Sequence, residues 1–243
     1  MAKIITINRE ELDYRANESY KTLRTNIQFC GDEIKVISFT SCTPNEGKSS
    51  VSFNLAVSFA EVGKKVVMVD ADLRKSVLIG RYKVGEIEHG LTHYLSGQKN
   101  LSDVLFKTHI ENLDIIFSGT YSPNPAELLN SARFNNMISK LREDYDYVII
   151  DTPPLGSVID SAIVAQVSDG AVIVIEANAI SYRFAQNVKE QLDKSNCRIL
   201  GAVLNKIPME KNSYYGKYYG KYYGKYYGKY YGTYGEDKGK SKK

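Results

Sequence analysis

The chain has 243 residues, 43% hydrophobic and 25% charged, so it can build one α/β domain with a large core plus appendages, while a second full domain would be hard to fit. No apolar run is long enough to span a bilayer, residues 1–10 are too polar for a signal peptide, and the three cysteines show no paired or metal-type spacing, so a cytoplasmic protein with reduced thiols is expected. The net charge of +4 is uneven, because nine lysines and two acidic residues from Lys211 onward give that segment +7 and leave the rest at about −3.

The first element expected in chain order is a helix over residues 17–29, whose apolar residues recur at the helical period on one face. Glu18, Lys21 and Arg24 lie three residues apart and share another face. They could form a solvated face with a small charge pair, or they could contact a neighbouring subunit. The residues alone leave both interpretations open.

The most informative stretch is residues 36–50, where an apolar run is followed by a polar loop and the start of a helix. Gly47, Lys48 and Ser49 match the end of the phosphate-binding pattern G-x-x-x-x-G-K-[ST]. In such a loop the backbone N–H groups and the helix N-terminus bind phosphate oxygens. Lys48 would reach the outer phosphates, and the Ser49 hydroxyl would bind Mg²⁺.

The loop departs from this pattern at its start, where Cys42 takes the place of the first glycine. Pro44 can set part of the turn, and Asn45 tolerates a positive φ, so the loop remains feasible. Cys42 could be accessible in such a loop, and no chemistry is assigned to it.

A helix is expected from Ser49 to Val62, followed by a buried strand over residues 66–69 that ends at Asp70 and Asp72. In open α/β sheets, ligand chemistry lies at the carboxyl ends of the strands. Two neighbouring carboxylates repel each other unless a cation offsets their charge, and Mg²⁺ would do so. The alternative is a turn that is merely rich in Asp.

The middle of the chain predicts a short helix over residues 90–95, a strand over 113–117 and one helix running from Pro125 to about Glu143. The next apolar strand, residues 147–150, ends at Asp151. An acid in this position is the usual second carboxylate near Mg²⁺ in enzymes that hydrolyse nucleotides or transfer their phosphoryl groups.

Two further strands are expected over residues 170–175 and 198–204, separated by a helix over 181–194. The alternation of strands and helices predicts an α/β fold with a doubly wound, mostly parallel sheet. Asn205 follows the last strand, where it could meet the base of a nucleotide or simply begin a polar loop.

From Tyr214 onward the sequence repeats a Tyr-Tyr-Gly-Lys unit without aliphatic residues, and eleven of the nineteen tyrosines lie here. Such a segment cannot build a core and is expected to be disordered. It could bind single-stranded nucleic acid through stacking and charge. It could also be a phosphorylation array, in which each phosphate adds about −1.5 to −2 charges, or a solubilising tail.

Taken together, these features resemble the bacterial tyrosine kinases, most closely the cytoplasmic capsular-polysaccharide type known as CpsD or CapB. The resemblance covers most of the chain and is most specific in five segments: 41–49, 66–74, 124–129, 151–154 and the tyrosine cluster. It implies a P-loop NTPase fold of the MinD/ParA-like type with a disordered C-terminal tail. It divides the chain into an N-terminal arm with an oligomerisation helix (1–35), a P-loop kinase domain (36–207) and a tyrosine-rich autophosphorylation tail (208–243).

The resemblance also implies ATP and Mg²⁺ as cofactors and assigns the site residues. Asn205 would contact the adenine. The full set of residues that would bind ATP is Pro44, Asn45, Glu46, Gly47, Lys48, Ser49, Ser50 and Asn205. Mg²⁺ would be arranged by Ser49, Asp72 and Asp151. The catalytic residues would be Lys48, Asp72 and, as the base for the tyrosine hydroxyl, Asp70.

In the same family, oligomers form through a Glu-x-x-Arg-x-x-Arg motif, which maps to Glu18, Lys21 and Arg24. Lys21 keeps the charge of an arginine but loses its bidentate fork, so a ring could be weaker. The tyrosines expected to be phosphorylated are Tyr214, Tyr215, Tyr218, Tyr219, Tyr222, Tyr223, Tyr226, Tyr227, Tyr230, Tyr231 and Tyr234.

The function implied is an ATP-dependent protein-tyrosine kinase that phosphorylates the tails of neighbouring subunits and regulates capsular or extracellular polysaccharide synthesis and export. The implied partners are a membrane activator, or polysaccharide co-polymerase, whose cytoplasmic segment recruits the kinase to the inner face of the plasma membrane, and a cognate phosphotyrosine phosphatase. No nucleic acid is expected. The alternative is a ParA/MinD-like ATPase switch whose basic aromatic tail binds nucleic acid or membrane, although those ATPases carry a second lysine early in the loop, where this chain has Ser41, Cys42 and Thr43.

Overall fold

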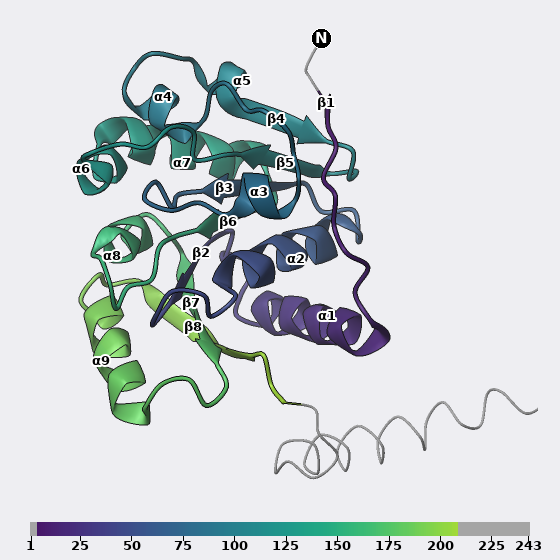
Figure 1. Ribbon diagram of the computed structural model, residues 1–243, viewed down its shortest axis with the longest axis vertical. Coiled ribbons are helices and arrows are strands. Elements are labelled where there is room, and N and C mark those ends of the chain that lie inside the picture. Colours follow the sequence, from purple (N-terminus) through teal and green to yellow (C-terminus); the bar gives the residue numbers. More distant parts are fainter. Residues whose placement is uncertain (1–3, 209–243) are drawn as a thin grey trace, which may run out of the picture. The chain divides into compact units, whose positions relative to one another are not determined.

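One eight-stranded sheet organises the part of the chain that the computed structural model describes, residues 4 to 208 (Figure 1). Its order is β1-β4-β5-β3-β6-β2-β7-β8, and all neighbouring strands are parallel except β4 and β5. The strands are β1 (Ile4–Ile5), β2 (Val36–Ser41), β3 (Val66–Asp70), β4 (Leu105–Thr108), β5 (Leu113–Ile116), β6 (Tyr147–Asp151), β7 (Gly170–Glu176) and β8 (Arg198–Asn205). The predicted doubly wound, mostly parallel sheet is confirmed.

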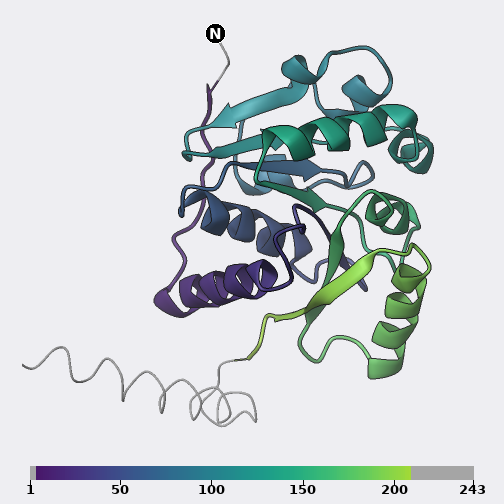
Figure 2. The same ribbon diagram turned by 180° about the vertical axis from the view of Figure 1, so that it is seen from behind.

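Helices cover both faces of this sheet, as Figures 1 and 2 show from opposite sides. Alternate residues of β2 enter different cores: Ile37 and Phe39 pack with α1 and α2, whereas Val36 packs with α7. The helices are α1 (Tyr14–Gln28), α2 (Lys48–Ala60), α3 (Leu78–Arg81), α4 (Leu91–Leu95), α5 (Leu101–Val104), α6 (Pro125–Leu129), α7 (Ala132–Asp144), α8 (Asp160–Ala165) and α9 (Tyr182–Asp193). Because the central strands are buried on both faces, their sequences are continuous apolar runs.

The structure corrects the prediction of a single helix from Pro125 to about Glu143. Helix α6 ends at Leu129, and α7 begins at Ala132. The Ser131 hydroxyl accepts a hydrogen bond from the Phe134 backbone N–H, so it caps a new helix. Strands β1 and β4, of two and four residues, had no counterpart in the prediction.

The compact unit of the structure runs to Asn205. The tyrosines of the predicted tail, from Tyr214 onward, lie outside the described residues. Within residues 4 to 208, no helix is long and apolar enough to cross a membrane.

Candidate nucleotide site

The phosphate loop connects β2 to α2 and takes its shape from two residues with positive φ. Asn45 has φ 68° and Gly47, the N-cap of α2, has φ 89°. A Cβ atom on Gly47 would lie 2.1 Å from Asn205 Nδ2 and would displace that amide, and residues other than glycine rarely adopt a φ of 89°. The same Nδ2 donates a hydrogen bond to the Glu46 carbonyl oxygen at 2.9 Å. The end of β8 therefore holds the loop beside the N-terminus of α2, whose first N–H groups can bind an anion.

Lys48 lies at the centre of the predicted site residues. Its Nζ is 2.8 Å from Asp151 Oδ1, 3.2 Å from Ser49 Oγ and 4.0 Å from Asp72 Oδ2. Asp151 Oδ1 also accepts a hydrogen bond from Ser52 Oγ at 3.3 Å. Lys48, Asp72 and Asp151 are buried, with exposed fractions of 6%, 8% and 1%. Acids at the ends of two strands, Asp72 after β3 and Asp151 in β6, thus converge on one buried cation after β2.

Asp70 is the most enclosed of the acids. It lies opposite Asp151 in the pairing of β3 with β6 and has no exposed surface. Its Oδ2 accepts hydrogen bonds from the Ser76 hydroxyl and, at 3.4 Å, from the Ser118 N–H, while its Oδ1 has no hydrogen-bond partner within the described part of the chain. Burial, and then the charge of Asp151, raise the pKa of Asp70 to about 7.

The donor set suits a hard divalent cation bound together with phosphate oxygens. Ser49 Oγ and the Asp72 and Asp151 carboxylates are all oxygen donors, which Mg²⁺ prefers. Across residues 4 to 208, no cluster of three or more His, Cys, Asp or Glu side chains is arranged as a metal site of its own. Mg²⁺ usually takes one or two carboxylates and completes its shell with phosphates and water, so this set fits it.

An ion pair with a buried carboxylate, which the sequence did not predict, anchors the segment after Asp72. Arg74 donates two hydrogen bonds to Asp160 at the start of α8, from Nε to Oδ2 at 2.7 Å and from Nη2 to Oδ1 at 2.9 Å. The Asp160 side chain is completely buried, and that of Arg74 is 39% exposed. The two positions are 86 residues apart in the chain, so no local signal could have revealed the pair.

Cys42 is fully buried, so the expectation that it could be accessible is wrong. Its carbonyl oxygen lies against Gly156, where a Cβ atom would be only 2.1 Å away. Burial, and then the charge of Glu46, raise the pKa of the Cys42 thiol to about 12.

We expect Cys42 to resist iodoacetamide at pH 8 in the folded protein, because the thiolate is the reactive form and this thiol is both neutral and enclosed. Peptide mass mapping should show Cys30, which is half-buried, labelled at least about tenfold faster. Denaturant should abolish the difference. Equal labelling of the two cysteines in the native protein would contradict the enclosed loop.

The predicted oligomerisation residues already have partners within their own chain. Lys21 Nζ lies 2.7 Å from Glu18 Oε1, as the i,i+3 spacing suggested. Arg24 Nη1 donates to the backbone oxygen and the hydroxyl of Ser58 on α2, at 2.6 and 2.9 Å. Arg24 therefore fixes α1 on α2, and its part in assembly stays a prediction.

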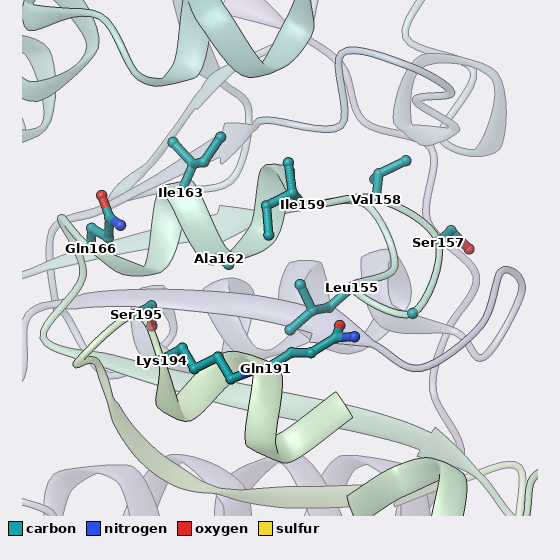
Figure 3. A pocket seen from close by; sticks show the side chains of 11 residues that line it. Leu155, Ser157, Val158, Ile159, Ala162, Ile163, Gln166, Gln191, Lys194 and Ser195 are labelled. Carbon is teal, nitrogen blue, oxygen red and sulfur yellow. The ribbon is translucent and has the colours of Figure 1, made fainter. Parts of the chain in front are cut away.

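A cavity of about 500 Å³ opens between α8 and α9 (Figure 3). Apolar side chains such as Leu155, Ile159 and Ile163 line it together with polar ones, among them Gln191 and Lys194. None of the predicted nucleotide-site residues lines this cavity, although Leu155 and Gly156, which do, contact the start of the phosphate loop at Ser41 and Cys42.

Known proteins resemble this chain over most of its length. A family model described as an AAA domain matches residues 34–200. The chain is 46% identical over 212 residues to tyrosine-protein kinase CpsD of Streptococcus pneumoniae serotype 4, covering 86% of this chain and 93% of that protein. It is 39% identical over 202 residues to tyrosine-protein kinase YwqD of Bacillus subtilis, covering 82% of this chain and 85% of that protein.

Among solved structures, the kinase domain of Escherichia coli tyrosine kinase ETK matches with a TM-score of 0.78 and 29% identity, over 88% of this chain and 93% of that one. The septum site-determining protein MinD of Pyrococcus horikoshii, complexed with Mg-ADP, matches with a TM-score of 0.63 and 27% identity. The match covers 72% of this chain and 71% of that one. The predicted P-loop fold of the MinD/ParA-like type is confirmed.

Proposed function

The chain belongs to the family of bacterial tyrosine-protein kinases, and we propose that it transfers the γ-phosphoryl group of ATP to tyrosines of its own C-terminal tail on a neighbouring subunit. The observation that carries this proposal is the convergence of Ser49, Asp72 and Asp151 within 4.0 Å of Lys48 Nζ at the start of α2. An ordinary strand-to-helix turn that binds no ligand would not require a lysine buried among acidic side chains.

Each part of the site has a role in such a transfer. The loop of residues 44–50 would hold the phosphate chain, with Lys48 on the outer phosphates and Asn205 at the adenine. Mg²⁺, held by Ser49, Asp72 and Asp151, would offset the charge of the phosphate oxygens. Because phosphoryl transfer has a loose transition state, the protein contributes mainly by positioning the reactants and neutralising charge.

Asp70 is the proposed acceptor of the tyrosine proton. A tyrosine hydroxyl has a pKa near 10, and the raised pKa of Asp70, about 7, brings the two groups closer in proton affinity. The carboxylate is fully buried beneath Ser76, so this role requires the segment after Asp72 to open when substrate binds.

The proposal includes the setting in which the kinase works. Residues 1–35 would contribute to a ring through Glu18, Lys21 and Arg24, residues 36–207 would be the kinase domain, and residues 208–243 its substrate. A separate membrane protein of capsular or extracellular polysaccharide export would activate the kinase and recruit it to the inner face of the plasma membrane. A phosphotyrosine phosphatase would reset it.

Intact-mass measurement after incubation with ATP and Mg²⁺, with and without an activator's cytoplasmic segment, tests this function. We expect several additions of about 80 Da each, located on the tail peptide. Replacing the eleven tail tyrosines with phenylalanine should remove them. ATP consumption without any addition would instead favour an ATPase switch of the MinD type.

A further inference from the structure

The side chain of Glu46 turns back into the phosphate loop. Its Oε2 accepts hydrogen bonds from the backbone N–H groups of Cys42 at 2.7 Å and Thr43 at 2.8 Å. Its Oε1 accepts one from the Glu176 N–H at the end of β7, at 3.3 Å. The residue is only 1% exposed. A buried carboxylate therefore connects the beginning of the loop to the neighbouring strand.

Two of the three hydrogen-bond donors to this carboxylate are backbone N–H groups at the start of the loop. Concave arrays of N–H groups are also what bind phosphate in such loops, and hydrogen bonds to a charged acceptor are the strong ones. The donors that Glu46 uses belong to residues 42 and 43, whereas those at the beginning of α2 follow Gly47. The carboxylate can thus shape the loop without occupying the helix N-terminus.

The backbone of the same residue is also held. Asn205 Nδ2 donates to the Glu46 carbonyl oxygen at 2.9 Å, so Glu46 joins the loop to the ends of both β7 and β8. We propose that Glu46 is a positioning residue of the nucleotide site, whose carboxylate holds the phosphate loop in its binding shape before ATP arrives. This inference rests on the proposed function, because it assumes that the loop binds a nucleotide.

Glu46→Gln tests it, because the neutral amide has one acceptor oxygen in place of two and turns an NH₂ group toward the donors. We expect the Kd for ADP with Mg²⁺, measured by calorimetric titration, to rise at least about tenfold, which is the loss of roughly one hydrogen bond to a charged group. In kinase assays the KM for ATP should rise, while kcat stays within about threefold. Glu61→Gln is the matched control, since this glutamate ends the same helix with its side chain 43% exposed beside Arg9.

Hydrogen exchange in the nucleotide-free protein separates a positioning role from a merely structural one. The amides of Cys42 and Thr43 should exchange at least about tenfold faster in Glu46→Gln, with the β6 amides unchanged. Glu46→Asp keeps the charge on a shorter stem and should give a smaller change in both measurements, which covers the case that Glu46→Gln fails to fold.

Unchanged ADP affinity in the variants, or faster exchange throughout the sheet in place of the loop alone, would overturn the inference. Failure of the wild-type protein to bind ADP would overturn the proposed function. The exchange measurement needs no nucleotide and would still report on the loop.

Discussion

Lys48→Met is expected to lower phosphotyrosine formation by at least about a thousandfold. The ammonium is the buried cation shared by Ser49, Asp72 and Asp151, so its loss removes the group that would neutralise the phosphates and leaves two acids facing the incoming anion. Intact mass after incubation with ATP, Mg²⁺ and the activator segment measures the effect.

Lys140→Met is the matched control, because Lys140 is an exposed lysine on α7 and its replacement removes the same charge from the chain. It should retain full phosphorylation. Thermal melting of both variants separates lost chemistry from lost folding. A folded Lys48→Met protein with wild-type phosphorylation would contradict the proposed site.

Arg74→Met is expected to lower the free energy of unfolding by about 3 kcal/mol, the lower end of the range for breaking a buried ion pair. Asp160 is completely buried, and its carboxylate would lose its ion-pair partner. The loss stays at the lower end of that range because water reaches the 39% of the Arg74 side chain that is exposed. Urea-induced unfolding measures the change.

Lys189→Met is the control for this second prediction. Lys189 and Asp193 are 2.6 Å apart but 57% and 47% exposed, so losing their pair should cost less than about 0.5 kcal/mol. The loss of unfolding free energy in Arg74→Lys should lie between those of Arg74→Met and Lys189→Met, because a lysine keeps the charge but not the bidentate contact. A loss in Arg74→Met no larger than in the control would show that Asp160 needs no cation.

The sequence predicted the parts of the molecule whose signals are local. The apolar runs of β2, β3, β6 and β7 are continuous because both faces of each strand are buried, and each predicted run lies within one strand. Asn45 and Gly47 adopt the positive φ values that a phosphate loop needs. The placement of Asp70 and Asp151 in the site was predictable because both lie at strand ends, which a parallel sheet brings to one edge.

Features that depend on distant contacts were missed for physical reasons. Cys42 is enclosed because residues near Leu155 pack on the loop, and the Leu155 N–H donates to the Ser41 carbonyl oxygen at 2.9 Å. Glu46 was expected among the ATP contacts, but nothing in its neighbourhood along the chain shows that its side chain turns inward. The pairing of Arg74 with Asp160 likewise exists only in the folded molecule.

The order of strands in the sheet has a consequence for folding kinetics. Strands β3, β6 and β2 lie side by side, although Lys48 and Asp151 are 103 residues apart in the chain. Pairing of such distant strands must first close long loops, which makes folding slow compared with that of helical bundles. The acids and the loop meet only when these strands have paired, so a chain in which they are still apart has no assembled site.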